Sequence, residues 1–315
     1  MSASTPAFLF PGQGSQTVGM GRSLSESFAE ARDAYREADE ALGFSISKLC
    51  FEGPEQDLRL TELTQPAILV TSIACERVLR SHGVKPSWVA GHSLGEYSAL
   101  ISAGSLSLSD AVRLVNLRGK FMQEAVPVGQ GAMAAILGLA AAQVEDLCRE
   151  AAQGETLSAA NFNSSEQTVV AGTARAGARA VEAAASRGAK RAILLPVSAP
   201  FHCALMAPAR ERLRPHLGAA RFRDLECPLI GNVDARAVRS GDAARENLLR
   251  QITAPVRWDA SVREMAGLGA THFVEVGPGR VLSGLVRRAL PGVRISNVED
   301  PASLEKTLLA LQESA

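Results

Sequence analysis

The sequence predicts an α/β fold in which helices cover both faces of a parallel sheet and a small lobe is inserted in the chain. Short apolar segments alternate with helical patterns along most of the 315 residues, which is the order of a parallel sheet. Over residues 126–197 the order becomes strand, helix, strand, strand, helix, strand, typical of a ferredoxin-like unit. A glycine-flanked turn around Ser93 joins a strand directly to a helix.

The first part of the chain predicts two strands and four helices. Gly43 closes the first helix, Pro66 lies in the first turn of the second, and Gly83 follows its end, as helix termini favour. Ser109 and Asp110 are expected to cap the fourth helix. The expected strands cover 7–10 and 87–90, and the expected helices cover 24–42, 65–81, 94–103 and 111–125.

The small lobe is expected over 126–197, so the main domain is discontinuous, over 1–125 and 198–315. A turn over 163–165 separates the second and third strands of the lobe. Its expected strands cover 132–137, 157–161, 167–171 and 191–195, and its expected helices cover 140–152 and 174–186.

After the lobe the alternation of strands and helices resumes. Ligands of such sheets bind at the carboxyl ends of the strands. The loops 12–16 and 198–202 and the turn around Ser93 each follow a strand, so these three segments can converge. The expected strands cover 229–232, 271–276 and 293–297, and the expected helices cover 204–217, 242–251, 258–267, 281–289 and 303–312.

The composition excludes several classes of protein. Lys plus Arg and Asp plus Glu both number 33, so the chain has no net charge to attract a nucleic acid. No apolar stretch is long enough to span a bilayer, and the N-terminus lacks the pattern of a signal peptide. We therefore expect a cytoplasmic protein with reduced thiols and no metal site, because the cysteines are scattered and form no C-x-x-C. They are Cys50, Cys75, Cys148, Cys203 and Cys227.

The turn around Ser93 matches the G-x-S-x-G nucleophile elbow, with Gly91 and Gly95 as its glycines. This sharp strand-to-helix turn holds a serine hydroxyl exposed, and glycines let the backbone turn tightly. The alternative is an ordinary strand–turn–helix that contains a serine. The expected strand before the turn and helix after it favour the catalytic interpretation.

A serine nucleophile needs a base to accept its proton. His202 is the best candidate, because it lies in a loop that follows a strand, whereas His92 adjoins Ser93 and more naturally supports the turn. Cys203 is rejected as a nucleophile because no second elbow surrounds it. No Asp or Glu stands out to orient the base, and a backbone carbonyl can do this as well. The other histidines, which are expected to be structural, are His82, His216 and His272.

Two further features have open alternatives. The loop 12–16 (GQGSQ) lacks the Lys-Ser/Thr of a P-loop, so it is either a plain turn or a donor of backbone N–H groups to an oxyanion. Arg118 shares an apolar helix face with Leu114, Val115, Phe121 and Met122. Its guanidinium either reaches the surface or awaits an anion such as a carboxylate, which its fork geometry matches.

Taken together, these residues resemble the malonyl-CoA:acyl carrier protein transacylase family, the acyltransferases of fatty acid and polyketide synthesis. The resemblance follows the family order and covers nearly the whole chain. The matching stretches are FPGQGSQ (10–16), GHSLGE (91–96), LRGKFM (117–122), NFN (161–163), PFH (200–202), GNVD (231–234), QITAPVRW (251–258) and EVGPG (275–279). The family fold implied is an α/β-hydrolase-like domain with a ferredoxin-like small lobe.

The resemblance implies roles for particular residues. Ser93 becomes the nucleophile and His202 the base, and the backbone carbonyl of Gln251 orients the histidine. The backbone N–H groups of Gln13 and Leu94 form the oxyanion hole.

Arg118 is implied to bind the free carboxylate of a malonyl group. The pocket around that group is expected to include His92, Met122, Asn161 and Phe201. Some family members carry Ser at position 201, and the Phe here is compatible with malonyl but crowds a branched acyl group.

The implied reaction transfers malonyl from malonyl-CoA to the phosphopantetheine thiol of acyl carrier protein, through a malonyl-serine ester. It needs no metal or redox cofactor, and a monomer is expected. Because the carrier protein is expected to be acidic, a local basic patch should exist on this chain. The candidates, all in the small lobe, are Arg175, Arg179, Arg187, Lys190 and Arg191.

The sequence leaves three alternatives open. A serine hydrolase or thioesterase uses the same elbow. A catalytically idle module could dock carrier proteins. The client could also be a polyketide synthase served in trans, or a malonate decarboxylase system, rather than a fatty acid synthase.

Overall fold

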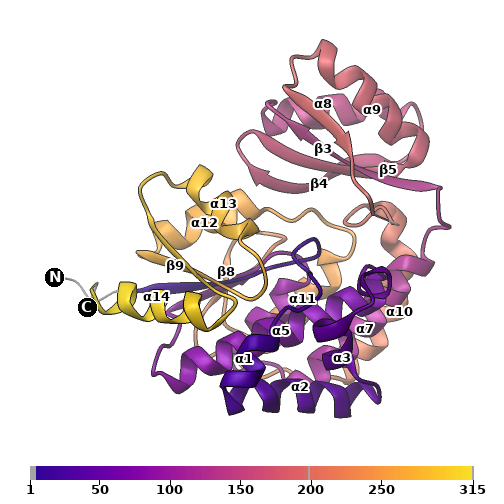
Figure 1. The fold of residues 1–315 in the computed structure, drawn as a ribbon. Helices are drawn as coiled ribbons and strands as arrows, with labels where there is room; N and C mark the ends of the chain where they lie inside the picture. Colours follow the sequence, from indigo (N-terminus) through magenta and orange to yellow (C-terminus); the bar gives the residue numbers. More distant parts are fainter. Residues whose placement is uncertain (1–4, 198, 314–315) are drawn as a thin grey trace.

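The computed structural model describes residues 5–197 and 199–313, which form a large unit with a smaller lobe above it (Figure 1). The sheet of the large unit has the strand order β10-β9-β1-β2-β7-β8. Its members pair in parallel except for β7 and β8, which are antiparallel. The strands are β1 (Pro6–Phe10), β2 (Trp88–Gly91), β7 (Leu229–Ile230), β8 (Ala237–Val238), β9 (His272–Val276) and β10 (Arg294–Val298). The predicted parallel α/β architecture is confirmed, and β8 is an element that the sequence did not predict.

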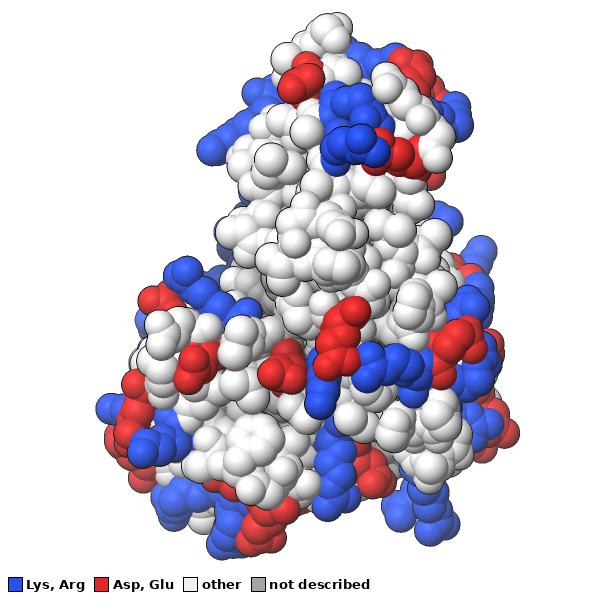
Figure 2. All heavy atoms as spheres, turned by 90° about the vertical axis from the view of Figure 1, so that its right-hand side faces the viewer, with Lys and Arg blue, Asp and Glu red and all other residues white. Residues whose placement is uncertain are grey.

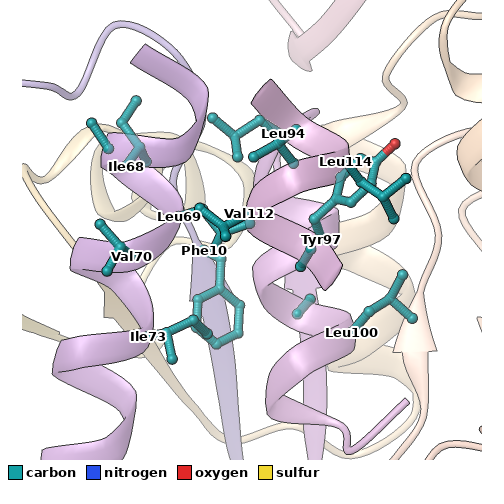
Figure 3. Close-up of a cluster of buried hydrophobic side chains, with 14 of the residues drawn as sticks. Phe10, Ile68, Leu69, Val70, Ile73, Leu94, Tyr97, Leu100, Val112 and Leu114 are labelled. Carbon is teal, nitrogen blue, oxygen red and sulfur yellow. The ribbon is translucent and has the colours of Figure 1, made fainter. Parts of the chain in front are cut away.

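Helices cover both faces of this sheet. Side chains alternate along β1, so that Phe8 and Phe10 pack in one core and Ala7 and Leu9 in another. Phe10 points toward α5, where Ile73 lies close to it (Figure 3). The helices of the large unit are α1 (Arg22–Ser27), α2 (Ala29–Leu42), α3 (Ile46–Glu52), α4 (Glu55–Leu58), α5 (Thr61–Ser81), α6 (Gly95–Ser102), α7 (Leu108–Glu124), α10 (Ala207–Ala219), α11 (Gly241–Gln251), α12 (Trp258–Gly267), α13 (Val281–Ala289) and α14 (Pro301–Gln312).

Helix α5 begins four residues earlier than predicted, and Pro66 lies inside it rather than in its first turn. A proline inside a helix removes one N–H donor and leaves the carbonyl four residues earlier unpaired. That carbonyl belongs to Glu62, and the side-chain amide of Asn116 on α7 donates to it at 2.8 Å. A partner distant in sequence therefore lets the helix continue through the proline.

Several other boundaries also differ from the prediction. The expected helix over 24–42 is broken at Phe28, whose extended backbone (φ −128°, ψ 130°) separates α1 from α2. The cap of α7 is Ser107 and not Ser109, since the Ser107 hydroxyl accepts from the backbone N–H of Asp110 at 3.0 Å. Helices α3 and α4 were not predicted, and a short 3₁₀ turn (Ala204–Met206) precedes α10.

The lobe contains β3 (Gly131–Leu137), α8 (Ala141–Ala152), β4 (Leu157–Ser164), β5 (Gln167–Thr173), α9 (Ala174–Ser186) and β6 (Arg191–Leu194). Its antiparallel strands are ordered β4-β5-β3-β6. The turn between β4 and β5 lies at 165–166 and not at 163–165, because Ser164 still pairs with Gln167. Helices α8 and α9 cover the side of the lobe's sheet that faces away from the large unit (Figure 1).

The two units share one core and one backbone seam. Along β3, Ala134 and Ile136 face the lobe's own helices, whereas Met133 and Ala135 belong to the same apolar cluster as the large unit's core. Strand β4 also joins the segment before α12, because Val256 exchanges backbone hydrogen bonds with residues 160 and 162 at 2.9 and 2.8 Å. These contacts set the lobe's position over the sheet.

Candidate active site

Ser93 sits in the turn between β2 and α6 with a left-handed backbone (φ 53°). The flanking glycines allow this turn. A Cβ on Gly91 would lie 1.9 Å from the carbonyl oxygen of Gly95, and a Cβ on Gly95 would lie 2.1 Å from that of Phe10. The backbone is thus packed too closely for side chains at either position, and the strained residue between them presents its hydroxyl.

His202 lies beside that hydroxyl. Its Nε2 is 2.7 Å from Ser93 Oγ, and its Nδ1 is 2.9 Å from the backbone oxygen of Gln251. A carbonyl only accepts, so Nδ1 carries the proton and Nε2 is left to accept from the serine O–H. His202 also has a left-handed backbone (φ 60°). Ser198, at the start of its loop, lies outside the described residues.

The His202 imidazole is uncharged at neutral pH. Burial, and secondly the nearby Arg118 charge, lower the pKa of His202 to about 3. At neutral pH the imidazole therefore holds a free lone pair toward Ser93, which is the state that general base catalysis requires.

Arg118 is buried (1% exposed) and does not reach the surface. One terminal nitrogen donates to Gln65 Oε1 at 2.7 Å, and the other donates to Gln251 Oε1 at 2.9 Å and to Ser93 Oγ at 3.0 Å. All three acceptors are neutral, so the guanidinium has no carboxylate in contact. Its charge is available to an anion that enters beside the serine.

Behind these residues lies a polar network that the sequence analysis did not identify. The Gln251 side-chain amide donates to the Ser93 carbonyl at 3.0 Å, to Glu96 Oε2 at 2.7 Å and to Asn232 Oδ1 at 3.2 Å. Asn232 in turn accepts from the Ser93 N–H at 2.8 Å and donates to the Gly91 carbonyl at 2.7 Å. Burial raises the pKa of Glu96 to about 7. The sequence signal for this network was Glu96, the one charged residue in helix α6.

Ser93, His202 and Arg118 line one cavity together with every residue predicted for the pocket, namely His92, Met122, Asn161 and Phe201. The lobe adds an apolar wall that the sequence analysis missed. It consists of Met133, Leu195 and Val197.

Gln13 and Leu94, the predicted oxyanion donors, also line this cavity. Their loops are in contact, since a Cβ on Gly12 would lie 2.5 Å from the carbonyl oxygen of His92. Within the described part of the chain, neither the Gln13 nor the Leu94 N–H donates to another protein group. Both donors are free for a ligand oxygen.

The remaining candidates have other surroundings. His92 Nε2 donates to Asn163 Oδ1 of the lobe at 2.9 Å, and its ring lies 5.5 Å from that of Trp258. Burial raises the pKa of the Cys203 thiol to about 11, which disfavours a thiolate nucleophile. Among residues 5–197 and 199–313, no group of histidines, cysteines and carboxylates could hold a metal ion.

Residues 7–305 match the family described as acyl transferase domain. The chain belongs to this acyl transferase family. It is 48% identical over 303 residues to the malonyl CoA-acyl carrier protein transacylase of Escherichia coli strain K12, covering 96% of this chain and 98% of that protein.

Two solved structures resemble this acyl transferase closely. An acyl carrier protein S-malonyltransferase from Vibrio cholerae has a TM-score of 0.94 at 45% identity, over 96% of this chain and 100% of that one. A malonyl-transacylase in complex with its type II PKS acyl-carrier protein has a TM-score of 0.95 at 45% identity, over 98% and 100%.

The predicted basic patch on the lobe of this acyl transferase is largely paired internally. Arg175 and Arg179 both contact Glu155, and Lys190 contacts Glu166 at 3.0 Å. Arg187 pairs with Glu150. Figure 2 shows charges of both signs at the outer end of the lobe and on the lower part of the large unit, with a mostly uncharged band between them. No helix in the described ranges is long and apolar enough to cross a membrane.

Proposed function

We propose that this acyl transferase moves a malonyl group from malonyl-CoA to the phosphopantetheine thiol of acyl carrier protein, through an ester on Ser93. The observation that carries the proposal is the buried Arg118 guanidinium, whose terminal nitrogen lies 3.0 Å from Ser93 Oγ. An acyl group bound to that oxygen has its far end beside a cation that lacks a carboxylate partner. The proteins that this chain resembles are described as malonyl transferases.

The first half-reaction acylates the serine. His202 Nε2 takes the proton as Ser93 Oγ attacks the thioester carbonyl. The N–H groups of Gln13 and Leu94 donate to the oxyanion of the tetrahedral intermediate. Its collapse breaks the carbon–sulfur bond, the proton on His202 passes to the departing sulfur, and coenzyme A leaves as a thiol.

The second half-reaction runs the same steps in the opposite direction. The phosphopantetheine thiol gives its proton to His202 and attacks the ester carbonyl. The carbon–oxygen bond then breaks, and Ser93 recovers its proton from the histidine. Each half-reaction balances without an external oxidant, reductant or metal, so no cofactor enters these steps.

Arg118 selects the acyl group in this proposal. The guanidinium would hold the malonyl carboxylate by charge-assisted, bidentate hydrogen bonds. Phe201 and the lobe's Met133 bound the same cavity, and they limit branching of the acyl chain.

We propose a two-domain architecture for this activity. The catalytic domain would be an α/β-hydrolase-like unit over 1–125 and 198–315, and a ferredoxin-like lobe would span 126–197. The strand order β4-β5-β3-β6 within the lobe supports this division. All the residues of the proposed chemistry come from one chain, which is consistent with a monomer. The five described cysteines form no disulfide, which supports a cytoplasmic location.

The alternative function from a different class of enzyme is that of a serine hydrolase. It would release malonate to water. A serine hydrolase usually orients its histidine with a carboxylate, whereas His202 Nδ1 contacts the backbone oxygen of Gln251. A polyketide synthase client fits the same chemistry, and the carrier-protein complex of one similar structure supports it. Only the identity of the carrier protein separates that case from fatty acid synthesis.

The test is to trap the ester. Incubation with malonyl-CoA should add one malonyl group to the peptide containing Ser93, as read by mass spectrometry, and Ser93→Ala should remove it. Adding acyl carrier protein that bears phosphopantetheine should discharge the ester onto the carrier. Release of free malonate with or without the carrier would instead indicate a hydrolase, and an adduct on Cys203 would refute the assignment.

A further inference from the structure

Glu96 is a fully buried carboxyl group that no step of the proposed mechanism uses. It lies in α6, three residues after the nucleophile, and is 0% exposed. Its Oε2 accepts two hydrogen bonds, from Gln251 Nε2 at 2.7 Å and from the backbone N–H of Asn232 at 3.2 Å. Its Oε1 is buried without a hydrogen-bond partner in the described residues. Such a group is costly to bury, so its position calls for a function.

The Gln251 amide connects this carboxyl group to Arg118. Gln251 Oε1 accepts from Arg118 at 2.9 Å, while Nε2 faces the oxygens of Ser93, Glu96 and Asn232. If the amide were flipped, its NH₂ group would face the guanidinium, which is also a donor, and its oxygen would face three other acceptors. Both sets of hydrogen bonds would then be lost. The contact with Glu96 is the shortest of the three and therefore helps most to hold the amide as observed.

We infer that Glu96 is a positioning residue for the selection of a carboxylated acyl group, because its Oε2 holds the Gln251 amide that holds Arg118 beside Ser93. This inference rests on the proposed malonyl transfer. Glu96 touches neither substrate nor reacting atoms in this scheme. Its effect reaches the acyl group through Gln251 and Arg118.

One acceptor oxygen is enough for this role. Because Oε2 takes both hydrogen bonds and Oε1 takes none, a carboxamide fits the site with its oxygen toward Gln251 and its NH₂ at the unpartnered position. Glu96→Gln should therefore keep Arg118 in place, whereas Glu96→Ala removes the acceptor altogether. The conservative variant separates positioning from charge.

The charge of Glu96 adds a signature that a purely structural residue lacks. Burial raises its pKa to about 7, and ionisation puts a negative charge near Arg118 that competes with the malonyl carboxylate. Preference for malonyl over acetyl should therefore fall as the pH rises through about 7.

The pKa values of four other ionisable groups around Glu96 are shifted away from 7. Burial lowers the pKa of His202 to about 3 and raises that of Tyr97 to about 12. The pKa of Asp234 is lowered by its hydrogen bonds from Arg250, and burial lowers that of His92. A malonyl carboxyl group ionises near pH 4 and stays charged.

The experiment measures kcat/KM for malonyl-CoA and for acetyl-CoA between about pH 6 and 8.5. The pH dependence of each kcat/KM value reports ionisable groups of the free enzyme. The variants are Glu96→Ala, Glu96→Gln and the matched control Glu275→Gln. Glu275 is also a fully buried carboxylate, but it accepts from the backbone N–H groups of Leu282 and Ser283 at 2.9 and 2.7 Å, away from the cavity. Thermal unfolding of each variant accompanies the kinetics.

Glu96→Ala should lower the malonyl-to-acetyl ratio by about ten-fold, as expected for the loss of a hydrogen bond to a charged network. Glu96→Gln should keep the ratio at pH 6 and lose its decline near pH 7. Glu275→Gln should change the melting temperature only. An unchanged ratio in a folded Glu96→Ala would overturn the inference, as would equal losses in Glu96→Ala and Glu96→Gln.

If Glu96→Ala does not fold, the pH profile of Glu96→Gln decides alone, and a decline like that of the wild type refutes the inference. Failure of the underlying function has a different result. Wild-type protein would then form no malonyl ester on Ser93, whatever stands at position 96.

Discussion

The two units that meet at the cavity contribute different things to it. The large unit supplies Ser93, His202 and Arg118, and two of these three have left-handed backbones. The lobe supplies mainly apolar side chains, such as Met133 and Leu195. The difference indicates that the charged and strained residues of the site belong to the large unit, while the lobe shapes the space in front of them.

The packing of each unit explains this division. The carboxyl ends of β1 and β2 place the two glycine-containing turns side by side, and α5, α7 and α11 bring Gln65, Arg118 and Gln251 against them. The lobe's sheet presents every second residue of β3 to the large unit. The residues of β3 that face the large unit therefore add apolar packing surface and no hydrogen-bond network.

After Ser93→Ala, which should abolish the ester, the largest effect should come from His202→Ala, which removes the proposed base from the large unit. General base catalysis is worth about 10²–10⁴-fold, so acylation of Ser93 should slow by about that factor. Stopped-flow or quenched-flow measurement of malonyl ester formation provides the rate, and circular dichroism checks that the fold persists.

The matched variant is Cys203→Ala, which alters the adjacent buried residue and should leave acylation close to the wild-type rate. A near-normal rate in His202→Ala would mean that another group accepts the proton. His92 would then be the next candidate, although its Nε2 donates to Asn163.

Arg118→Ala should have the next largest effect. The malonyl carboxylate is remote from the reacting carbonyl, so Arg118 would hold it about equally in the ground and transition states. Loss of this interaction should therefore appear mainly in KM and kcat/KM. Charged hydrogen bonds contribute about 1.5–3 kcal/mol, and an unpaired buried carboxylate costs more. We expect kcat/KM for malonyl-CoA to fall by on the order of 10²-fold.

Acetyl-CoA is the internal control for that variant. It has no carboxylate to lose, so its kcat/KM should hold or rise and the preference for malonyl should collapse. Equal losses for both substrates would make Arg118 a structural residue.

Ser93 and Arg118 stand out in the sequence because each has a local signature. Ser93 has its flanking glycines and Arg118 interrupts an apolar helix face. Helix α5 shows the limit of local reasoning, since the carbonyl that Pro66 leaves unpaired accepts a hydrogen bond at 2.8 Å from Asn116, a residue distant in the sequence.

The hydrogen-bond network behind the site could not be predicted either, because its members are also distant from one another in the sequence. Gln65 and Gln251 are far from Arg118 in the chain, and nothing in their neighbours marks them as its partners. Gln251 was expected to act through its backbone carbonyl alone, whereas its side chain also joins Arg118 to Glu96. Such contacts depend on tertiary packing, which the hydrophobic periodicity of the sequence does not predict.

A third effect concerns the pH range over which the large unit's base works. Because burial lowers the pKa of His202 to about 3, the imidazole stays neutral as the pH falls from about 6 to 5. An unshifted histidine with a pKa near 6.5 would be about 24% neutral at pH 6 and about 3% neutral at pH 5, so acylation would slow about eight-fold over this range. Acylation by malonyl-CoA should instead remain nearly flat over this range in single-turnover assays. An acid limb with a midpoint near 6.5 would contradict the buried, neutral base.

The smallest effect should come from the contact between the units. Asn163 of β4 accepts from His92 Nε2 at 2.9 Å, and a neutral hydrogen bond contributes about 1 kcal/mol. Asn163→Ala should therefore lower the free energy of unfolding by about that amount and change kcat/KM for malonyl-CoA by less than about ten-fold. Asn163→Asp keeps the acceptor oxygen and should retain more of the stability, as measured by urea denaturation. The backbone seam at Val256 remains in both variants and keeps the lobe over the cavity. A loss in Asn163→Ala as large as that of Arg118→Ala would show that the lobe also orients the reacting groups, and the division of labour between the two units would then be wrong.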